Sequence, residues 1–396
     1  MTRDHAIQIG VLFSSSGSTS VTEQTMLSAT KFAIDEINGG GGIRGRALAP
    51  IYCDPEGEPE LYQQQAERLL TDSKVRVILG CYTSRQRKAV LSVLDRASGL
   101  LCYPAQYEGF EYSENVIYFG AVPNQNSLFL AQYLLQKEAP RLFIVGSDYV
   151  WPRESGRIMA DLIKSGGGDV LGQCYLGDDA TEHEFDALIK RIEAAKPDFI
   201  FNNFVGRSNV QFYRAYVENE LDAGQIPVAS LTTSESDIKE IGAAATVGHI
   251  TAASYFATQS NRSNLACLER YRDLRGARPD ANMCWDAAYT QTHVVAQAMR
   301  ENDPDNINAI RSGILGRSFD APQGRISIDP LNAHCWVWPK IGIARADGQF
   351  DIVAETTQAI RPDPYRTTYA MTEGDEPLMQ PSLSASDGSY GLRVRR

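Results

Sequence analysis

The stretch that decides the fold is VRVILGCYTSRQRKAVLSVLDRASGLLCYP, residues 75–104. Apolar residues dominate 75–80 and again 99–104, and between them residues 84–98 repeat apolar positions with a helical period. A short apolar strand, an amphipathic helix and a second apolar strand form a βαβ unit, whose two strands lie parallel. The residues that follow both strands are therefore expected at one edge of a sheet.

The same alternation extends outward from this unit in both directions. Further strands are predicted at 6–13, 46–53, 116–121, 141–147, 169–176, 198–204 and 227–231. Further helices are predicted at 21–38, 58–73, 127–138, 153–166, 181–195 and 207–219. A chain of 396 residues exceeds the size of one hydrophobic core. The sequence thus predicts an α/β protein with two doubly wound parallel-sheet lobes.

The last third of the chain returns between these lobes. It contains a predicted strand at 249–256, helices at 261–275 and 281–302, a strand at 324–330 and a hairpin at 335–356 that turns at ADGQ. Repeated crossings indicate a multi-strand hinge. We expect an N-terminal lobe of 1–121 with 252–330, a C-terminal lobe of 122–251 with 331–365, and a tail of 366–396.

Composition excludes several classes of protein. The net charge of −11 argues against nucleic acid or an anionic membrane as the main partner. No apolar run reaches the 18 residues of a membrane span. The first residues lack the basic start and cleavage site of a secretory leader, and seven cysteines without a C-x-x-C pair fit a reduced protein. We expect a cytoplasmic location, with a periplasmic one open if a leader has been removed.

No motif predicts a cofactor or a metal site. GGGIRG at 40–45 matches the dinucleotide pattern, but it follows a helix and leads into a strand, whereas a phosphate-binding loop opens a helix. The five histidines lack metal-ligand spacing. Cys102, with Glu108 and Lys88 near it in sequence, is the candidate nucleophile of an amide hydrolase. Because Cys102 lies in the apolar run GLLCYP without an activating base, a core thiol is favoured and no enzyme is predicted.

Hydroxyl, phenol and amide side chains gather after the predicted strands. Such groups can donate to a carbonyl and accept from an NH₂ group, whereas aromatic rings supply apolar walls. Asp148 and Arg153 are charged candidates, but Arg153 with Pro152 and Glu154 fits the first turn of a helix, and Asp148 or Glu154 favours the N-terminus of that helix. The sequence therefore predicts a pocket for a small neutral polar molecule. The candidate ligand-binding residues are Tyr82, Thr83, Ser84, Tyr103, Gln106, Tyr107, Tyr149, Phe204, Thr232 and Thr233.

Several blocks resemble a known family over residues 5–365. The order of elements is similar to the type I periplasmic-binding-protein fold of branched-chain amino-acid receptors. More narrowly, GCYTSRQRKAV, LLCYPAQYEGFEYS, PNQNS, GSDYVWPRES, SLTTSES, FDAPQG and IRPDPY resemble the amide and urea branch of that family. Within this branch, the blocks look most like those of cytoplasmic amide sensors that negatively regulate aliphatic amidase operons.

The resemblance implies binding without catalysis. It implies that an amide is held by Tyr82, Ser84, Tyr103, Tyr149 and Thr232. Gln106 and the block RSNVQFY instead resemble the urea receptors, so urea and short amides both stay open as ligands. An amide sensor would regulate transcription antitermination by holding an RNA-binding antiterminator. The alternative function is the substrate-binding protein of an ABC transporter for urea or short amides, with a permease as partner. A homo-oligomer is left open.

Overall fold

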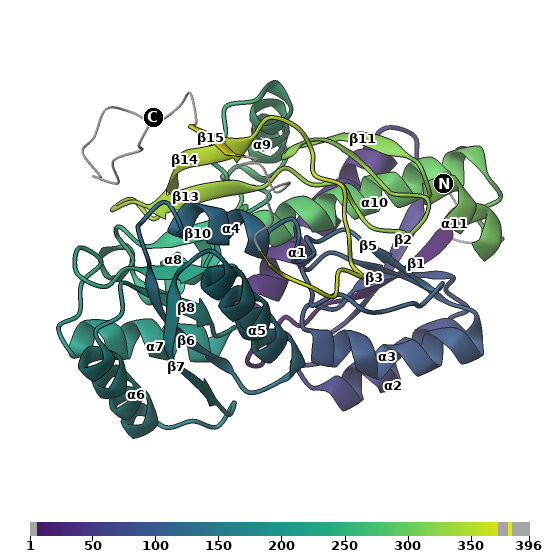
Figure 1. Ribbon diagram of the computed structural model, residues 1–396. Coiled ribbons are helices and arrows are strands. Elements are labelled where there is room, and N and C mark those ends of the chain that lie inside the picture. Colours follow the sequence, from purple (N-terminus) through teal and green to yellow (C-terminus); the bar gives the residue numbers. More distant parts are fainter. Residues whose placement is uncertain (1–5, 371–378, 382–396) are drawn as a thin grey trace. The chain divides into compact units, whose positions relative to one another are not determined.

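The computed structural model describes residues 6–370 and 379–381, which divide into two compact units (Figure 1). Unit 1 consists of the chain up to Ala121 together with Asn261–Val337, and unit 2 of Val122–Ser260 and the chain from Trp338 onward. The sequence placed the second and third crossings at 251/252 and 330/331, earlier than these boundaries.

The later crossings have a visible cause in the hydrogen bonds of the crossing segments. The backbone N–H of Ala257 donates to Glu235 and the Thr258 hydroxyl to Phe350, both at 2.9 Å or less, which ties this segment to unit 2. The segment before the third crossing belongs to unit 1, because the N–H of Cys335 donates to the carbonyl of Tyr118 at 2.8 Å.

Unit 1 contains a five-stranded parallel sheet in the order β2-β1-β3-β4-β5. Its strands are β1 (Ile7–Leu12), β2 (Leu48–Cys53), β3 (Val77–Gly80), β4 (Leu100–Tyr103) and β5 (Val116–Tyr118). The helices are α1 (Ser20–Gly39), α2 (Pro59–Thr71), α3 (Ser84–Ala97), α9 (Arg262–Arg275), α10 (Met283–Glu301) and α11 (Ile307–Ile314). Helices α1 and α10 pack on one face, and α2 and α3 on the other (Figure 1). The prediction of a doubly wound parallel sheet is confirmed.

Helix α3 illustrates why the quoted stretch folds as it does. Thr83 caps its start, since the Thr83 hydroxyl accepts the N–H of Gln86 while the Gln86 side chain accepts the N–H of Thr83. Val90, Val93 and Leu94 form its buried face against the sheet. Ser98 ends the helix in a left-handed conformation, from which the chain enters β4.

Unit 2 contains an eight-stranded mixed sheet in the order β15-β14-β13-β10-β9-β8-β6-β7. The parallel strands are β6 (Arg141–Ser147), β7 (Asp169–Leu176), β8 (Phe199–Asn203), β9 (Val228–Ser230) and β10 (Ile250–Ala253). The antiparallel strands are β13 (Lys340–Ala344), β14 (Phe350–Thr356) and β15 (Met379–Pro381). The predicted hairpin at 335–356 is present as β13 and β14.

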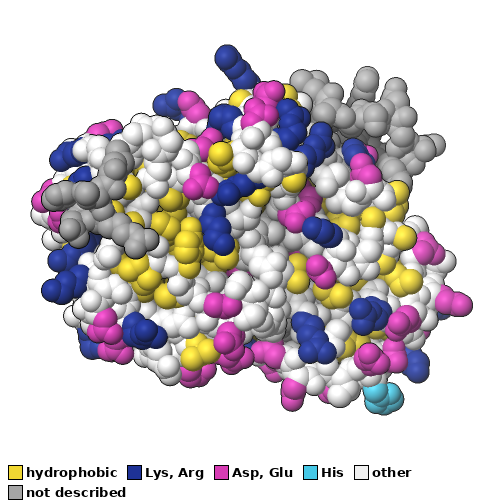
Figure 2. All heavy atoms as spheres, turned by 180° about the vertical axis from the view of Figure 1, so that it is seen from behind, with side chains coloured by type: hydrophobic (Ala, Val, Ile, Leu, Met, Phe, Trp, Pro, Cys, Tyr) yellow, Lys and Arg dark blue, Asp and Glu magenta, His cyan; other side chains and the backbone are white. Residues whose placement is uncertain are grey.

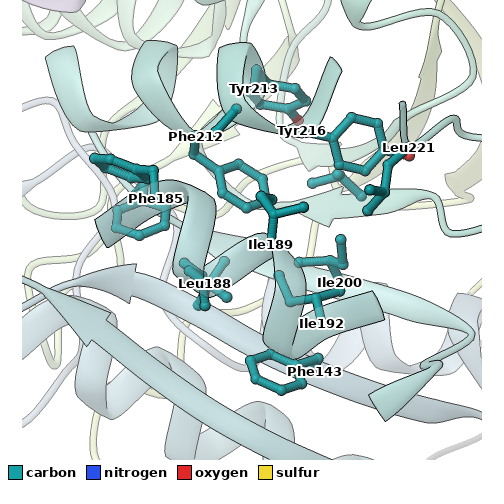
Figure 3. Close-up of a cluster of buried hydrophobic side chains, with 14 residues drawn as sticks. Phe143, Phe185, Leu188, Ile189, Ile192, Ile200, Phe212, Tyr213, Tyr216 and Leu221 are labelled. Atoms are coloured by element: carbon teal, nitrogen blue, oxygen red, sulfur yellow. The ribbon is translucent and has the colours of Figure 1, made fainter. Parts of the chain in front are cut away.

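Helices α6 and α7 cover a hydrophobic core in unit 2. Figure 3 shows Phe185, Leu188, Ile189 and Ile192 of α6 gathered with Phe212 of α7 and Ile200 of β8 in one cluster. The helices of the unit are α4 (Ser127–Leu134), α5 (Val150–Ser165), α6 (Glu182–Ala195), α7 (Arg207–Glu218), α8 (Glu235–Ile241) and the short 3-10 helix η2 (Ala243–Ala245).

Some described elements were not predicted. They include the short helices α8 and α11 and strand β11 (Ser318–Ala321). Strand β11 pairs with β12 (Gly324–Ser327), which lies within the predicted strand 324–330, as a separate antiparallel ribbon. Of the predicted tail 366–396, residues 371–378 and 382–396 lie outside the described residues, whereas β15 extends the sheet of unit 2.

Within the described chain, no helix is long and apolar enough to span a membrane. On the face seen in Figure 2, acidic and basic side chains are interspersed.

Candidate functional site

In both sheets the strand order reverses beside the first strand of the unit. Strand β1 lies between β2 and β3, and β6 lies between β7 and β8. At such a reversal the connecting helices leave to opposite faces, so the carboxyl ends of the adjacent strands border a crevice where α/β sheets bind ligands. The segments after β1, β3, β6 and β8 are therefore the candidate binding regions of their respective units.

The turn after β3 carries Tyr82 and Thr83. It begins with Cys81 in a left-handed conformation at φ 67°. The side-chain carbonyl of Gln86 accepts the N–H of Tyr82 at 2.9 Å and that of Thr83 at 2.8 Å. Tyr82 is 8% exposed and Thr83 is half-buried, so a rigid turn holds both residues at the strand end.

Gln86 is itself held by a buried carboxyl group. Its amide donates to Oε1 of Glu23 at 3.2 Å, and Glu23 also accepts the N–H of Ser14 at 2.8 Å and the Thr19 hydroxyl at 2.6 Å. Burial raises the pKa of Glu23 to about 7, although these hydrogen bonds and one from Tyr62 act in the opposite direction. This network joins the end of β1 to the turn after β3.

An ion cluster surrounds the buried Arg87 of α3, the helix that follows this turn. Arg87 Nη2 lies 3.3 Å from Glu108 and Arg87 Nε lies 2.9 Å from Glu111, and the Lys88 ammonium lies 3.5 Å from both carboxylates. Ser84 donates its hydroxyl to Glu108 and accepts from Nη1 of Arg87 at 3.2 Å. The predicted ligand residue Ser84 therefore already has an acceptor and a donor inside unit 1.

The predicted residues after β4 divide into buried and half-buried positions. The Tyr103 hydroxyl donates to the carbonyl of Tyr82 at 2.5 Å. Tyr107 hydrogen-bonds His334 at 2.5 Å and stacks on Tyr118 with ring centroids 4.6 Å apart. Tyr103 and Tyr107 are almost fully buried, whereas Gln106 is half-buried. Tyr103 thus supports the backbone of Tyr82, and Tyr107 belongs to an aromatic stack.

In unit 2 the segment after β6 carries Tyr149. This residue is half-buried and directly precedes α5, with extended backbone. Asp148 precedes Tyr149 and Arg153 follows it in α5, and Arg153 Nε lies 2.5 Å from Oδ1 of Asp148. The charges that flank Tyr149 thus pair with each other.

The segments after β8 and β9 are connected by hydrogen bonds. The Thr232 hydroxyl donates to the carbonyl of Phe204 at 3.1 Å, and the Thr233 hydroxyl lies 3.2 Å from the Tyr213 hydroxyl. The sequence placed the Phe204 side chain in a pocket wall. The structure places it in the core with Phe185 and Phe212, because the strand ends one residue earlier and the ring turns under α6 and α7.

Several residues of these regions were not predicted from the sequence. Gln86 was detectable, since T-x-x-Q before an apolar helix is a capping signal. Glu23 and Arg87 carry no such signal, because charged residues on helices are usually exposed. Asn203, at the end of β8, is fully buried, accepts from Ser155 at 3.1 Å and has no acceptor for its Nδ2 group among the described residues.

The thiol-hydrolase alternative requires a reactive Cys102 thiol beside Glu108. Cys102 is fully buried, and burial raises the pKa of its thiol far above the ordinary value. Glu108, its proposed partner, is occupied by Ser84, Arg87 and Lys88. A buried neutral thiol is a poor nucleophile. The part of the chain that the structure describes holds no cluster of three metal-ligating side chains.

Comparison with known proteins establishes the family. The family model described as "Periplasmic binding protein domain" matches residues 7–371, so this chain belongs to that family of ligand-binding proteins. The leucine-specific-binding protein of Salmonella typhimurium is 21% identical over 202 residues, which cover 49% of this chain and 53% of that protein. The Leu/Ile/Val-binding protein of Escherichia coli K12 is also 21% identical over 202 residues, with the same coverage. The match thus spans about half the length of these curated relatives.

Solved structures share the fold over most of the chain. An ABC-transporter solute-binding protein of Rhodopseudomonas palustris BisB5, in complex with 3,4-dihydroxybenzoic acid, is 20% identical with a TM-score of 0.81 and covers 90% of this chain and 98% of its own. The protein LivJ of Streptococcus pneumoniae, in complex with isoleucine, is 17% identical with a TM-score of 0.74 and covers 88% and 99%. The type I periplasmic-binding-protein fold is confirmed. These relatives are binding proteins, in agreement with the prediction of binding without catalysis.

Proposed function

We propose that this chain binds a small uncharged amide or urea at the carboxyl ends of its strands, and releases it unchanged, as the substrate-binding protein of an ABC importer. Family membership supports ligand binding, and the transporter receptors among the relatives favour the importer. The resemblance in the blocks around Tyr82 and Thr232 supports the amide or urea class. Compared with the relatives that hold a benzoate or isoleucine, this chain is proposed to take a smaller neutral molecule.

The observation that carries the neutral ligand is the pairing of the charges beside Tyr82 and Tyr149. In unit 1, Arg87 and Lys88 pair with Glu108 and Glu111. In unit 2, Arg153 pairs with Asp148. A charged ligand removed from water needs a partner of opposite charge. Hydroxyl groups such as those of Tyr149 and Thr232 suit a neutral amide, because each can both donate and accept.

The size of such a ligand limits its affinity. At a ceiling of about −1.5 kcal/mol per non-hydrogen atom, a ligand of four such atoms gains at most about −6 kcal/mol, which corresponds to a dissociation constant of about tens of micromolar. The same few kcal/mol limit any ligand-driven change of conformation. We therefore propose a receptor for ligand concentrations in the micromolar range or above.

Hydroxyl-deleting variants test the binding residues. In Tyr149→Phe and Thr232→Val the loss of one neutral hydrogen bond should weaken acetamide or urea binding about fivefold each. Tyr216→Phe is the matched control, because the Tyr216 hydroxyl donates to the carbonyl of Ile226 inside unit 2 at 2.9 Å. Unchanged affinity in both site variants, with the control behaving like the wild type, would remove these residues from the proposed site.

Gln106 is proposed to set the choice between urea and amides. The side-chain oxygen of Gln106 can accept a hydrogen bond from one NH₂ group of urea, and its side-chain NH₂ can donate to the urea carbonyl. A proline at this position offers no polar side chain. Gln106→Pro should therefore raise the ratio of acetamide to urea affinity. A ratio equal to that of the wild type would separate Gln106 from selectivity.

The second candidate function is a cytoplasmic amide sensor that controls an amidase operon through an RNA-binding antiterminator. The blocks CYTS at 81–84 and TTSES at 232–236 favour it. The two candidates differ in compartment, since an importer receptor works outside the cytoplasmic membrane and a regulator of transcription inside it. Fractionation of cells that express the native gene decides between them. Capture of a basic RNA-binding protein that acetamide releases would favour the sensor.

A further inference from the structure

Unit 1 contains a pocket away from the strand ends described above. Its volume is about 620 Å³, within the range of small-molecule sites, and it lies among α1, α9, α10 and β11. The apolar lining consists of Ala266, Cys267, Phe319 and Pro322. The polar lining consists of Glu36, Arg262, Ser263, Arg270, Tyr289, His293 and Asp320.

The acidic groups of this pocket already have partners. Glu36 accepts Nε of Arg270 at 2.6 Å and the Tyr289 hydroxyl at 2.6 Å, and its Oε2 lies 3.1 Å from Nε2 of His293. Burial would raise the pKa of Glu36, but these three contacts hold it at about 2, so the carboxylate stays charged. Asp320 lies 3.4 Å from Arg325. A cationic ligand therefore finds no carboxylate without a partner here.

Arg262 differs from the other charged groups of the lining. Arg262 is exposed and Ser263 next to it is half-buried, and neither side chain has an ion-pair or hydrogen-bond partner among the described residues. Both stand at the start of α9, which has 14 residues and whose Asn261 cap accepts the N–H of Asn264. The positive end of the helix dipole adds to the guanidinium charge. This end of the pocket is suited to a carboxylate or another oxyanion.

Beside the Glu36–Arg270 pair, the pocket is lined by aromatic rings. The rings of Phe319 and His293 stack with centroids 5.5 Å apart and an interplanar angle of 14°. The ring centroids of Tyr289 and His293 lie 4.5 Å apart, so the rings of Tyr289, His293 and Phe319 are packed in one row. Such a row of rings can pack against a flat apolar group of a ligand, whereas an inorganic anion has no apolar group to bury there.

From this geometry we propose that unit 1 has a second ligand site, which binds a small organic carboxylate with an apolar body. Arg262 and Ser263 bind the carboxylate, and Phe319 with His293 contacts the body. The site is independent of the proposed amide or urea site, because its residues lie on α9, α10 and β11 and not at the strand ends.

Equilibrium dialysis of radiolabelled benzoate with the full chain tests the proposal. Arg262→Gln should weaken saturable binding at least about tenfold, the loss of one charge-assisted contact, and Phe319→Ala should weaken it as well. Arg278→Gln is the control with the same change of charge on an exposed residue outside the pocket. Tyr149→Phe and Thr232→Val should leave benzoate binding unchanged.

Four outcomes of this experiment would contradict the proposal. Saturable binding that survives Arg262→Gln but is lost in Thr232→Val would place benzoate at the strand ends instead. Equal competition by inorganic phosphate would exclude a role for the apolar wall, and equal binding of benzamide would exclude recognition of the charge. Absence of saturable benzoate binding to the wild type would also overturn it.

Discussion

Arg87 and Glu111 form a buried two-point ion pair in unit 1, with Nε to Oε1 at 2.9 Å and Nη2 to Oε2 at 3.2 Å. The guanidinium also lies 4.5 Å from the ring centroid of Tyr107. Arg87 is on α3 and Glu111 lies beyond β4, so the pair joins the helix that follows Tyr82 to the segment that follows Gln106. Both predicted binding segments of unit 1 are thereby attached to one buried cation.

Loss of one partner of this pair should destabilise the fold. Burial opposes the charged form of Glu111, yet Arg87 keeps the pKa of its carboxyl below the ordinary value. Glu111→Gln leaves the buried guanidinium with less compensation and should cost about 3 kcal/mol. Urea unfolding measures the change, with the exposed Glu114→Gln as control. Similar unfolding midpoints for the two variants would show that the pair contributes little.

The stability of unit 2 should depend on pH through His249. Nδ1 of His249 accepts the N–H of Val228 at 3.0 Å, and burial lowers its pKa to about 3 from an ordinary value of 6.5. As the pH falls below 6.5 the unfolded chain takes up this proton first. The contribution of His249 is therefore complete above pH 6.5 and is lost progressively as the pH falls toward 3.

Substitution of this histidine separates its effect from those of other groups. Compared with the wild type, His249→Gln should lose less stability between pH 6.5 and 4, measured by urea unfolding at each pH. The exposed His183→Gln should keep the wild-type dependence. If the free energy of unfolding of all three proteins depends on pH in the same way, His249 is not the group that titrates.

Gln86 should affect both stability and ligand binding. Gln86→Leu leaves the N–H groups of Tyr82 and Thr83 without their acceptor, which should cost about 1–3 kcal/mol. The turn then loses its fixed geometry, so acetamide or urea should bind more weakly. Gln64→Leu, on the exposed face of α2, is the matched control. Destabilisation with unchanged affinity would show that the turn does not position a ligand.

Thiol accessibility tests the placement of the cysteines. Cys53 and Cys174 are partly accessible, whereas the other five cysteines are buried and include Cys102. An aromatic disulfide reagent should react with at most two thiols of the native protein, and Cys53→Ser with Cys174→Ser should abolish that fast reaction. Rapid modification of Cys102 in this double variant would revive the hydrolase hypothesis.

The fold was largely predictable because its signals are local. The apolar runs and the helical period of residues 75–104 depend on neighbouring side chains, and they locate α3 and its flanking strands correctly. The positions of the two later crossings carry no local signal, because hydrogen bonds between distant segments define them, such as that of Ala257 with Glu235. Helix α11 was not predicted although Ile307, Ile310 and Ile314 repeat with a helical period, because the helix has only eight residues.

The candidate site was less predictable because contacts over long sequence separations decide which side chains are available. Ser84 and Glu108 are 24 residues apart, and their hydrogen bond engages a hydroxyl that the sequence assigned to the ligand, so the role of Ser84 stays a prediction. Phe204 was assigned to the pocket because it follows a strand, but its ring packs in the core. Tyr149 and Gln106 remain half-buried at the predicted segments, and their role in binding stays a prediction.

The central claim, that a small uncharged ligand is bound and left unchanged, is tested most directly by calorimetric titration with acetamide and urea beside leucine and benzamide. For acetamide or urea we predict saturable heats that return to baseline after each injection, with a dissociation constant of about tens of micromolar or weaker. Continuous heat from turnover, or saturable binding of leucine with none of acetamide and urea, would contradict the claim.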